Sequence, residues 1–322
     1  MYVTSLRVEG LRDAPAWEER ELGRVVSLPP GPAGVAVVEA LEVLAASLVP
    51  DGLPSALGRL GLAPPGAAPE VLEEGGLPVQ ADIPDPGEAA AWLDLAQTRN
   101  VAVQVELALD PPLYGRLREI AVRDPRLVTA LGQAPTVRVK VGWLFTRDLS
   151  AVALGLSEVG VGDVSLSSVP AERPRWLAEL LGDLGRRFLR VDDREPETAL
   201  VERLAAASLS PEPDRRRRYR AASEALGRPP FGLGDLEIVR SDGRLQAAFG
   251  PELRRARRFG GAGLEALRLV EAVLLAQPDV LAVEGGGAQQ RDPTAVRDWL
   301  AAATEGPEAT LEQVFLAPGG GR

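Results

Sequence analysis

The end of the chain constrains the fold most, because it contains two apolar strands separated by one helix. A buried strand is predicted over Val280–Val283, and another in "LEQVFLAP". Between them, "RDPTAVRDWLAAAT" predicts a helix that begins after Asp292, with Pro293 at its first position. Apolar strands joined through a helix are typical of a parallel sheet with helices on its faces. The chain is therefore predicted to be α/β.

A glycine-rich turn and a longer helix precede this region. The turn is predicted in "RRFGGAG", and the helix after it carries Leu267, Val270 and Leu274 on one face. Gln277-Pro278 ends that helix.

The beginning of the chain has a similar order of elements. "SLRVEG" and "GRVVSL" are predicted to be short strands, and "LPPGPAG" then leads into a helix. That helix has one apolar stripe, formed by Val37, Leu41, Leu44 and Leu48. We predict that the strand before the loop, the Val280 strand and the Val314 strand lie together in one mainly parallel sheet.

The middle of the chain alternates apolar and polar residues, as half-buried strands do. "VAVQVELAL", "TVRVKVGWLF" and "SAVALGLSEVGVGDVSL" are predicted strands, and "LYGRLREIAVRDPRLVTAL" is a helical insertion broken at Pro125. "GLAPPGAAPEVLEEGGLP" is predicted to be a connection, and "RPRWLAELLGDLGRRFLRV" has helical spacing. "LEIVRSDGRLQAAF" predicts a hairpin that turns at Asp242-Gly243.

Composition excludes several kinds of function. The 322 residues include no cysteine and no histidine, so thiolate nucleophiles, cysteine metal sites and histidine general bases are excluded. The net charge of −10 argues against a chain devoted to coating nucleic acid. There is neither an apolar run long enough to span a membrane nor a signal peptide, so we expect a cytoplasmic protein without membrane partners.

The order of these segments resembles the ATPase head of the ABC superfamily, in the SMC and RecF-like branch. "GPAGVAVVEALEVL" aligns with the Walker A loop and helix, "FGGAG" with the signature motif and "PDVLAVEGG" with Walker B. "QVFLAPGG" matches the strand before the switch histidine. The resemblance implies a P-loop NTPase-like head with a mainly parallel core sheet, an antiparallel β subdomain and an inserted helical segment. One head-like domain, 1–322, would then comprise a core lobe (1–62 and 232–322), a β-rich subdomain (70–170) and a helical insertion (171–231).

Every chemical position of that match is empty. In the loop, the phosphate-binding lysine falls at Val37 and the Mg²⁺-binding Ser/Thr at Val38, where apolar side chains can do neither task. The Walker B aspartate becomes Glu284, the catalytic glutamate Gly285 and the switch histidine Gly319. The match implies a vestigial phosphate loop at Gly31, Gly34, Val35, Ala36, Val37 and Val38, and a signature-like set at Gly260, Gly261 and Gly263.

We therefore predict a catalytically inactive subunit that acts as a scaffold or regulatory partner, in a homodimer or beside an active ATPase. No metal site and no cofactor are expected, although backbone amides at the helix start leave weak ATP or ADP binding open. A nucleotide sensor that binds without hydrolysing is an alternative. Glu284 could equally be an ordinary solvated carboxylate or helix-cap acceptor.

Two arginine clusters leave a nucleic-acid hypothesis open. In "RRRRYRAASEAL" the arginines are followed by Tyr219, which could stack on bases. The simpler interpretation is a solvated helix face, which we favour because the chain is acidic. The residues concerned are Arg215, Arg216, Arg217 and Arg218 in one cluster, and Arg254, Arg255, Arg257 and Arg258 in the other.

Overall fold

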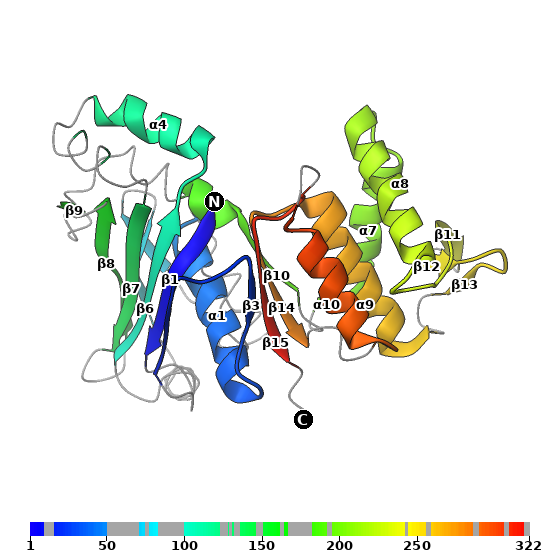
Figure 1. Cartoon of the computed structure of the whole chain (residues 1–322), viewed down its shortest axis with the longest axis horizontal. Coiled ribbons are helices and arrows are strands. Elements are labelled where there is room, and N and C mark those ends of the chain that lie inside the picture. Colours follow the sequence, from blue (N-terminus) through cyan, green and yellow to red (C-terminus); the bar gives the residue numbers. More distant parts are fainter. Residues whose placement is uncertain are drawn as a thin grey trace. The chain divides into compact units, whose positions relative to one another are not determined.

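The computed structural model describes most of the chain and divides it into two compact units. It describes residues 1–9, 16–49, 71–74, 77–82, 100–122, 128, 131, 136–145, 151–161, 164–166, 182–191, 195–241, 244–255, 259–285, 290–305 and 309–318. One unit comprises Met1–Gly23 and Leu28–Phe188, and the other Arg24–Ser27 and Leu189–Arg322. These boundaries differ from the predicted ranges, since the N-terminal strand pairs with the β-rich middle rather than with the C-terminal strands. Figure 1 labels the elements of both units.

The first unit is built on an eight-stranded sheet in which the described strands pair antiparallel. Its order is β2-β1-β6-β7-β8-β5-β4, with β9 paired to β8. The predicted alternation is confirmed, because Val103, Val105, Leu107, Val137 and Val139 are all buried. The strands are β1 (Tyr2–Glu9), β2 (Trp17–Arg20), β4 (Val71–Glu74), β5 (Leu77–Asp82), β6 (Asn100–Ala108), β7 (Thr136–Phe145), β8 (Ala151–Val161) and β9 (Val164–Leu166).

Strands β4 and β5 correct one prediction. They lie in and just after the passage that was predicted to be a connection, and they pair antiparallel with each other. The abundance of proline and glycine there concealed two short strands, in which Glu74 pairs with Leu77. The break predicted at Pro125 lies outside the described residues.

The first unit includes the helices α1 (Pro32–Ser47) and α4 (Pro111–Ala121), and residues 182–186 are also helical. Asp110 begins α4, because its Oδ1 accepts the amide of Leu113 at 2.9 Å. Its Oδ2 accepts Nη1 of Arg187 at 2.5 Å, which ties the start of the helix to a residue far along the chain.

The second unit contains a four-stranded sheet in the order β10-β14-β15-β3. Its strands are β10 (Phe188–Val191), β14 (Val280–Gly285), β15 (Gln313–Pro318) and β3 (Val25–Ser27). Both β14 with β15 and β15 with β3 are parallel, so the predicted placement of these three strands in one parallel sheet is confirmed. Among the described strands the parallel pairs lie in this small sheet, whereas the larger sheet of the other unit is antiparallel. The sequence of β10 was wrongly predicted to continue a helix.

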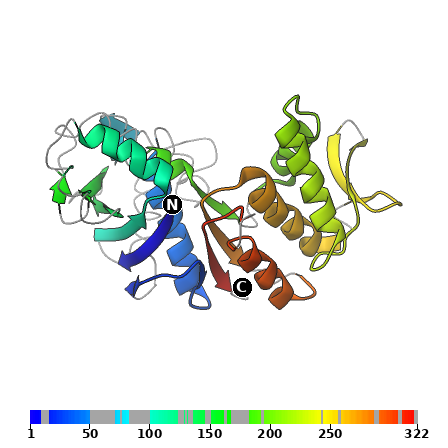
Figure 2. The same cartoon turned by 45° about the horizontal axis from the view of Figure 1, so that its top comes forward.

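Four α-helices and a π-helical turn complete this unit. They are α7 (Glu197–Ser208), α8 (Pro213–Gly227), α9 (Gly260–Val270), the turn η3 (Glu271–Ala276) and α10 (Pro293–Ala302). Figures 1 and 2 both show α9 and α10 on one side of β14 and β15, with α7 and α8 beyond them. None of the helices in the described part of the chain has the length and apolar character needed to cross a bilayer.

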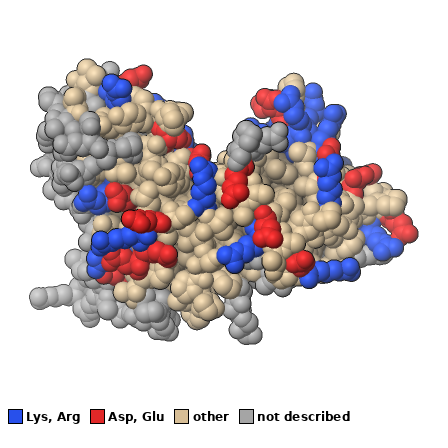
Figure 3. Space-filling view, viewed as in Figure 1, with Lys and Arg blue, Asp and Glu red and all other residues tan. Residues whose placement is uncertain are grey.

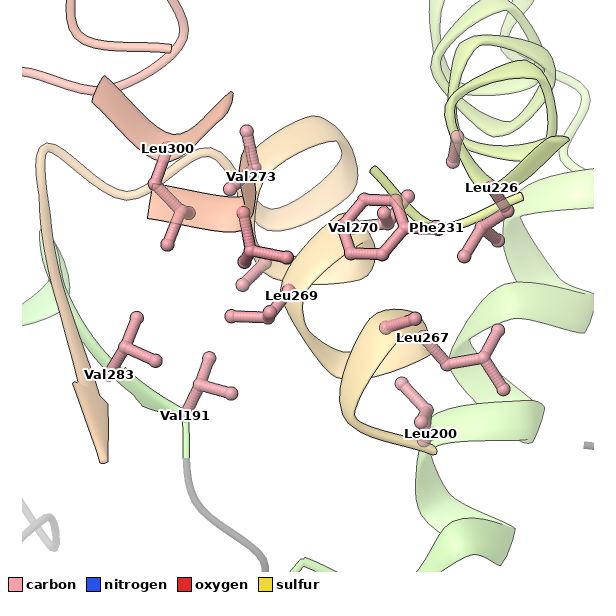
Figure 4. Packing of buried hydrophobic residues seen from close by; sticks show 14 of the residues in the cluster. Val191, Leu200, Leu226, Phe231, Leu267, Leu269, Val270, Val273, Val283 and Leu300 are labelled. Atoms are coloured by element: carbon pink, nitrogen blue, oxygen red, sulfur yellow. The ribbon is translucent and has the colours of Figure 1, made fainter. Parts of the chain in front are cut away.

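A hydrophobic core joins these helices to the sheet. Leu267, Val270 and Val273 pack between the strand residue Val283 and the helix residue Leu226, as Figure 4 shows. The predicted apolar face of α9 is therefore confirmed for Leu267 and Val270, which are buried, while Leu274 is partly buried against the same core. The cap predicted for α10 is also confirmed, since Asp292 Oδ1 accepts the amide of Ala295 at 3.0 Å.

An arginine fixes α7 against the π-helical turn. Arg203 Nε donates to Glu271 at 2.8 Å, and Nη1 donates to Glu195 at 2.5 Å. Hydrogen bonds to Glu195 and Glu271 raise the pKa of Arg203, and the bond to Glu195 has the larger effect. The buried carboxylate of Glu271 is thus neutralised inside the helical layer.

A small antiparallel sheet contains the predicted hairpin. It has three strands, β11 (Leu236–Ser241), β12 (Arg244–Phe249) and β13 (Arg254–Arg255). Ser241 pairs with Arg244, so the loop between β11 and β12 has the predicted two residues, which themselves lie outside the described residues.

Gln277 provides a test of the end of η3. Its φ of 50° and ψ of 58° are left-handed, a conformation that favours glycine. We expect Gln277→Gly to raise the free energy of unfolding by about 0.5–1 kcal/mol in chemical denaturation. The control Gln277→Ala keeps the strain and should give no gain; equal stability of the Gly and Ala variants would contradict this explanation.

The Asp110 contacts predict a pH dependence. Burial alone would raise the pKa of Asp110, but the Leu113 amide and the Arg187 guanidinium outweigh it and hold the pKa below its usual value. The carboxylate therefore stabilises the fold above about pH 4, and this contribution is lost as pH falls through the lowered pKa. Asp110→Asn keeps a capping side chain but loses the charge, and should cost about 1 kcal/mol at pH 7. Denaturation from pH 7 to pH 2.5 should show the difference from wild type narrowing below pH 4; a constant difference would contradict the assignment.

Candidate functional site

The loop before α1 has the shape of a tight turn that only glycine permits. Gly31 precedes the helix with φ 75° and ψ −152°, and Pro32 occupies the first helical position. A Cβ on Gly34 would lie 2.2 Å from the carbonyl oxygen of Pro29, so no larger residue fits there. Turn geometry and close packing are therefore sufficient to explain both glycines.

The helix after this loop is buried on every side rather than on one stripe. Ala36, Val37 and Val38 are at most 1% exposed, and Val35 is partly buried. Even Glu39 and Glu42, which lie outside the predicted apolar stripe, are buried, and each has an interaction partner. A helix buried all round is a central core element, so Val37 and Val38 are packing residues.

The carboxyl end of β14 carries Glu284, the residue aligned with Walker B. Its Oε2 accepts Nη2 of Arg190 at 2.5 Å, and Arg190 comes from the neighbouring strand β10. The Arg190 side chain is 6% exposed and that of Glu284 17%. Glu284 is thus half of an internal ion pair, rather than the solvated carboxylate or helix cap considered from sequence.

Gly285, the position of the catalytic glutamate in the family match, has a φ of +94°. Residues with side chains rarely adopt this conformation. A Cβ there would lie 3.8 Å from Oε1 of Glu265 in α9, so an introduced glutamate would also start beside another carboxylate. Both features disfavour a general base at this position.

The signature-like glycines form the first turn of α9 rather than a separate loop. Gly260, with φ +64°, and Gly261 are exposed, whereas Gly263 is buried. Gln290 holds this turn, since its Nε2 donates to Ala262 O at 2.6 Å and to Glu265 Oε2 at 3.0 Å. The switch-histidine position, Gly319, lies outside the described residues.

The structure therefore brings Glu284, Gly285 and the signature-like turn into one unit. The residues Gly31 to Val38 belong to the other unit. Sequence reasoning missed Arg190, Glu265 and Gln290, which hold the elements of the second unit together. No local signal marks Arg190, since it is one arginine among many, and its partner is 94 residues away.

The first arginine cluster lies at the start of α8. Arg215, Arg217 and Arg218 are exposed, while Arg216 is partly buried and its Nη1 donates to Ser210 O at 2.5 Å. Tyr219 is not free to stack on a base, because its hydroxyl donates to Leu236 O at 3.3 Å and its ring packs against the core. Burial, with a smaller effect from the charge of Glu237, raises the pKa of Tyr219.

The second cluster lies on β13, apart from the upper end of α8 (Figure 1). Arg254 pairs with Glu252 at 2.5 Å, and Arg255 also has a partner. Arg257 and Arg258 lie outside the described residues. The described members of this cluster are therefore already engaged within the chain.

Comparisons with known proteins give distant structural likenesses alone. No protein-family model and no curated protein sequence matches the chain. A solved structure of the recombination mediator protein RecF-ATP in the RecFOR pathway is 10% identical with a TM-score of 0.39, covering 98% of this chain and 93% of that one. A structure titled RecF-ATPrS in the same pathway is 9% identical with a TM-score of 0.38, covering 88% and 85%.

The ion pair at the end of β14 predicts a structural role for Glu284. Glu284→Ala should cost about 1.5–3 kcal/mol of unfolding free energy, because it removes a charge-assisted hydrogen bond to the nearly buried Arg190 side chain. Replacing both partners, as Arg190→Met with Glu284→Leu, should recover most of that loss. Chemical denaturation of the three proteins checks this; a Glu284→Ala variant as stable as wild type would show that the pair does not stabilise the fold.

Proposed function

We propose that this protein is a catalytically inactive, ATPase-head-like subunit that serves as a scaffold or regulatory partner in a protein complex. The observation that carries the proposal is that the positions aligned with catalytic residues are used for packing or pairing. Val37 and Val38 are in the core, and Glu284 is paired with Arg190.

The loop supports the proposal through desolvation. A lysine at position 37 would need to leave the core before it could reach a phosphate, and a charged amine buried there would be strongly destabilising. The amides at the start of α1 are the part of this loop suited to an anion, but Pro32 contributes no donor. Nucleotide binding by this loop would therefore be weak.

The end of β14 supports the proposal through charge. Glu284 Oε2 is used by the Arg190 guanidinium, which competes with a metal ion for the same oxygen. Gly285 offers no side chain, so the general base of the family is missing at this position, and with it a proton transfer that contributes about 10²- to 10⁴-fold. A head that lacks both functions could still present its surfaces to a second copy or to an active ATPase, and we expect such a partner in the cytoplasm.

An ATPase assay tests this directly. Purified wild-type protein should release no phosphate from ATP that depends on Mg²⁺. The matched control is Arg190→Met with Glu284→Leu, which removes the Glu284 carboxylate while keeping the fold. Mg²⁺-dependent hydrolysis by wild type that this double variant loses would overturn the proposal. Hydrolysis that is equal in both proteins would indicate a contaminating enzyme.

Thermal shift separates the inactive scaffold from a nucleotide sensor. ATP, ADP and GTP at millimolar concentration should leave the melting temperature unchanged in the presence of Mg²⁺. A ligand at 100 times its Kd would stabilise the protein by about 2.7 kcal/mol, so a clear shift would favour the sensor.

Restoring the family residues should damage the fold without creating activity. We expect Val37→Lys with Val38→Ser and Gly285→Glu to lose about 3–5 kcal/mol or more, because charge and polar groups enter the core and a glutamate enters a positive-φ position. Val37→Met is the control for Val37→Lys, since it has similar length without charge. A restored variant that stays folded and hydrolyses ATP would contradict the structural explanation.

A further inference from the structure

We infer that the corner between α7 and α8 is a docking surface for an acidic protein segment that also carries apolar side chains. The corner consists of Leu209–Glu212 and the first two turns of α8, with exposed Arg215, Arg217, Arg218 and Arg220. It lies outside every ATPase motif, so the inference goes beyond the proposed function and does not depend on it.

Apart from Tyr219, whose ring packs against the core, the first two turns of α8 contribute no side chain to the core of its unit. The buried residues of the helix are Ala222 and Leu226, both in its second half. Figures 1 and 2 show the amino end of α8 projecting past the neighbouring helices, and Figure 3 shows blue (Lys and Arg) side chains gathered over that end. This part of the helix is therefore not explained by hydrophobic burial.

The arginines also lie at the unfavourable end of the helix. The amino end of a helix carries a partial positive charge, which repels cations in the first turns. Asp214 offsets part of this and pairs with Arg217 at 3.4 Å, although both side chains are more than three-quarters exposed. The side chains of Arg215, Arg218 and Arg220 form no hydrogen bond or ion pair within the described part of the chain. Residues that oppose local stability without burial or pairing are typical of functional surfaces.

An exposed leucine is held rigidly beside these arginines. Leu209 is 84% exposed although its amide donates to Ala205 O at 3.1 Å. The next residue, Ser210, is buried, accepts the Glu212 amide at 3.2 Å and receives Arg216 Nη1 at its carbonyl. The leucine is thus held on an ordered turn, so its backbone loses little conformational freedom when a partner covers it.

The composition of the corner favours a protein over a nucleic acid. Arginine is enriched among the residues that carry most of the binding energy at protein contacts, and covering the exposed Leu209 would add buried apolar area. Single-stranded nucleic acid needs an aromatic platform, and Tyr219 faces the core. Glu212 and Asp214 would repel the continuous negative charge of a phosphate backbone. A peptide can place its carboxylates only at the positions where they pair with the arginines.

Binding of a defined peptide tests the inference. The probe is a fluorescein-labelled, glutamate-rich peptide with leucine at every fourth position, compared with the same peptide carrying alanine instead and with a labelled thymidine oligonucleotide. Fluorescence anisotropy should show that wild type binds the leucine peptide more tightly than either comparison probe, and that salt weakens binding.

Matched variants assign the binding to the corner. Arg215→Glu with Arg218→Glu should weaken peptide binding by about tenfold or more, and Leu209→Ser by about fivefold. Arg228→Glu with Arg254→Glu makes the same change in net charge elsewhere and should stay within about twofold of wild type. The corner double variant should melt at or above the wild-type temperature, because glutamate suits the amino end of a helix.

Four results would overturn the inference. The first is that the peptide does not bind at about 1 mM, a limit that corresponds to very weak affinity. The second is that both double variants weaken peptide binding equally, and the third is that the corner double variant melts at a lower temperature than wild type. The fourth is that the oligonucleotide binds more tightly than the peptide and Leu209→Ser has no effect, which would assign the corner to nucleic acid.

Discussion

The ion pair between Arg190 and Glu284 joins two adjacent strands of the second unit and determines what the Glu284 carboxylate can bind. Charges this deeply buried must be paired, and the two side chains come from adjacent strands of the small sheet. The pair uses the carboxylate that the family resemblance assigns to metal orientation. It also explains why a glutamate there need not indicate catalysis, since its removal would leave a buried cation.

The residues at the positions aligned with the phosphate loop also have structural explanations. Gly31 and Gly34 are required by the backbone of a tight turn, and Val37 and Val38 fill a core around a helix that is buried on all sides. Such a helix cannot accept polar side chains without loss of stability. The loop before α1 and the end of β14, which belong to different units, thus each support the proposal that the residues there serve the fold.

Much of the fold could be predicted because local signals agreed with the tertiary structure. The apolar runs of β14 and β15, the Asp292 cap and the hairpin of β11 and β12 were predictable from short stretches of sequence. Strand β10 was missed because "FLRV" continues a helical spacing and contains an arginine, whose partner is a distant glutamate. The full burial of α1 was also missed, since Glu39 and Glu42 suggest a polar face. Of the candidate site, the positions were predictable, whereas their present contacts depend on long-range packing.

Hydrogen exchange at the end of β14 tests the central claim most directly. Exchange of the amides in Val280–Gly285 would be measured with and without Mg²⁺ and millimolar ATP. If Glu284 has become a purely structural residue, exchange in this strand should be unchanged by the nucleotide. Slower exchange of these amides with Mg²⁺ and ATP together, but not with either alone, would show a working metal–nucleotide site and contradict the account.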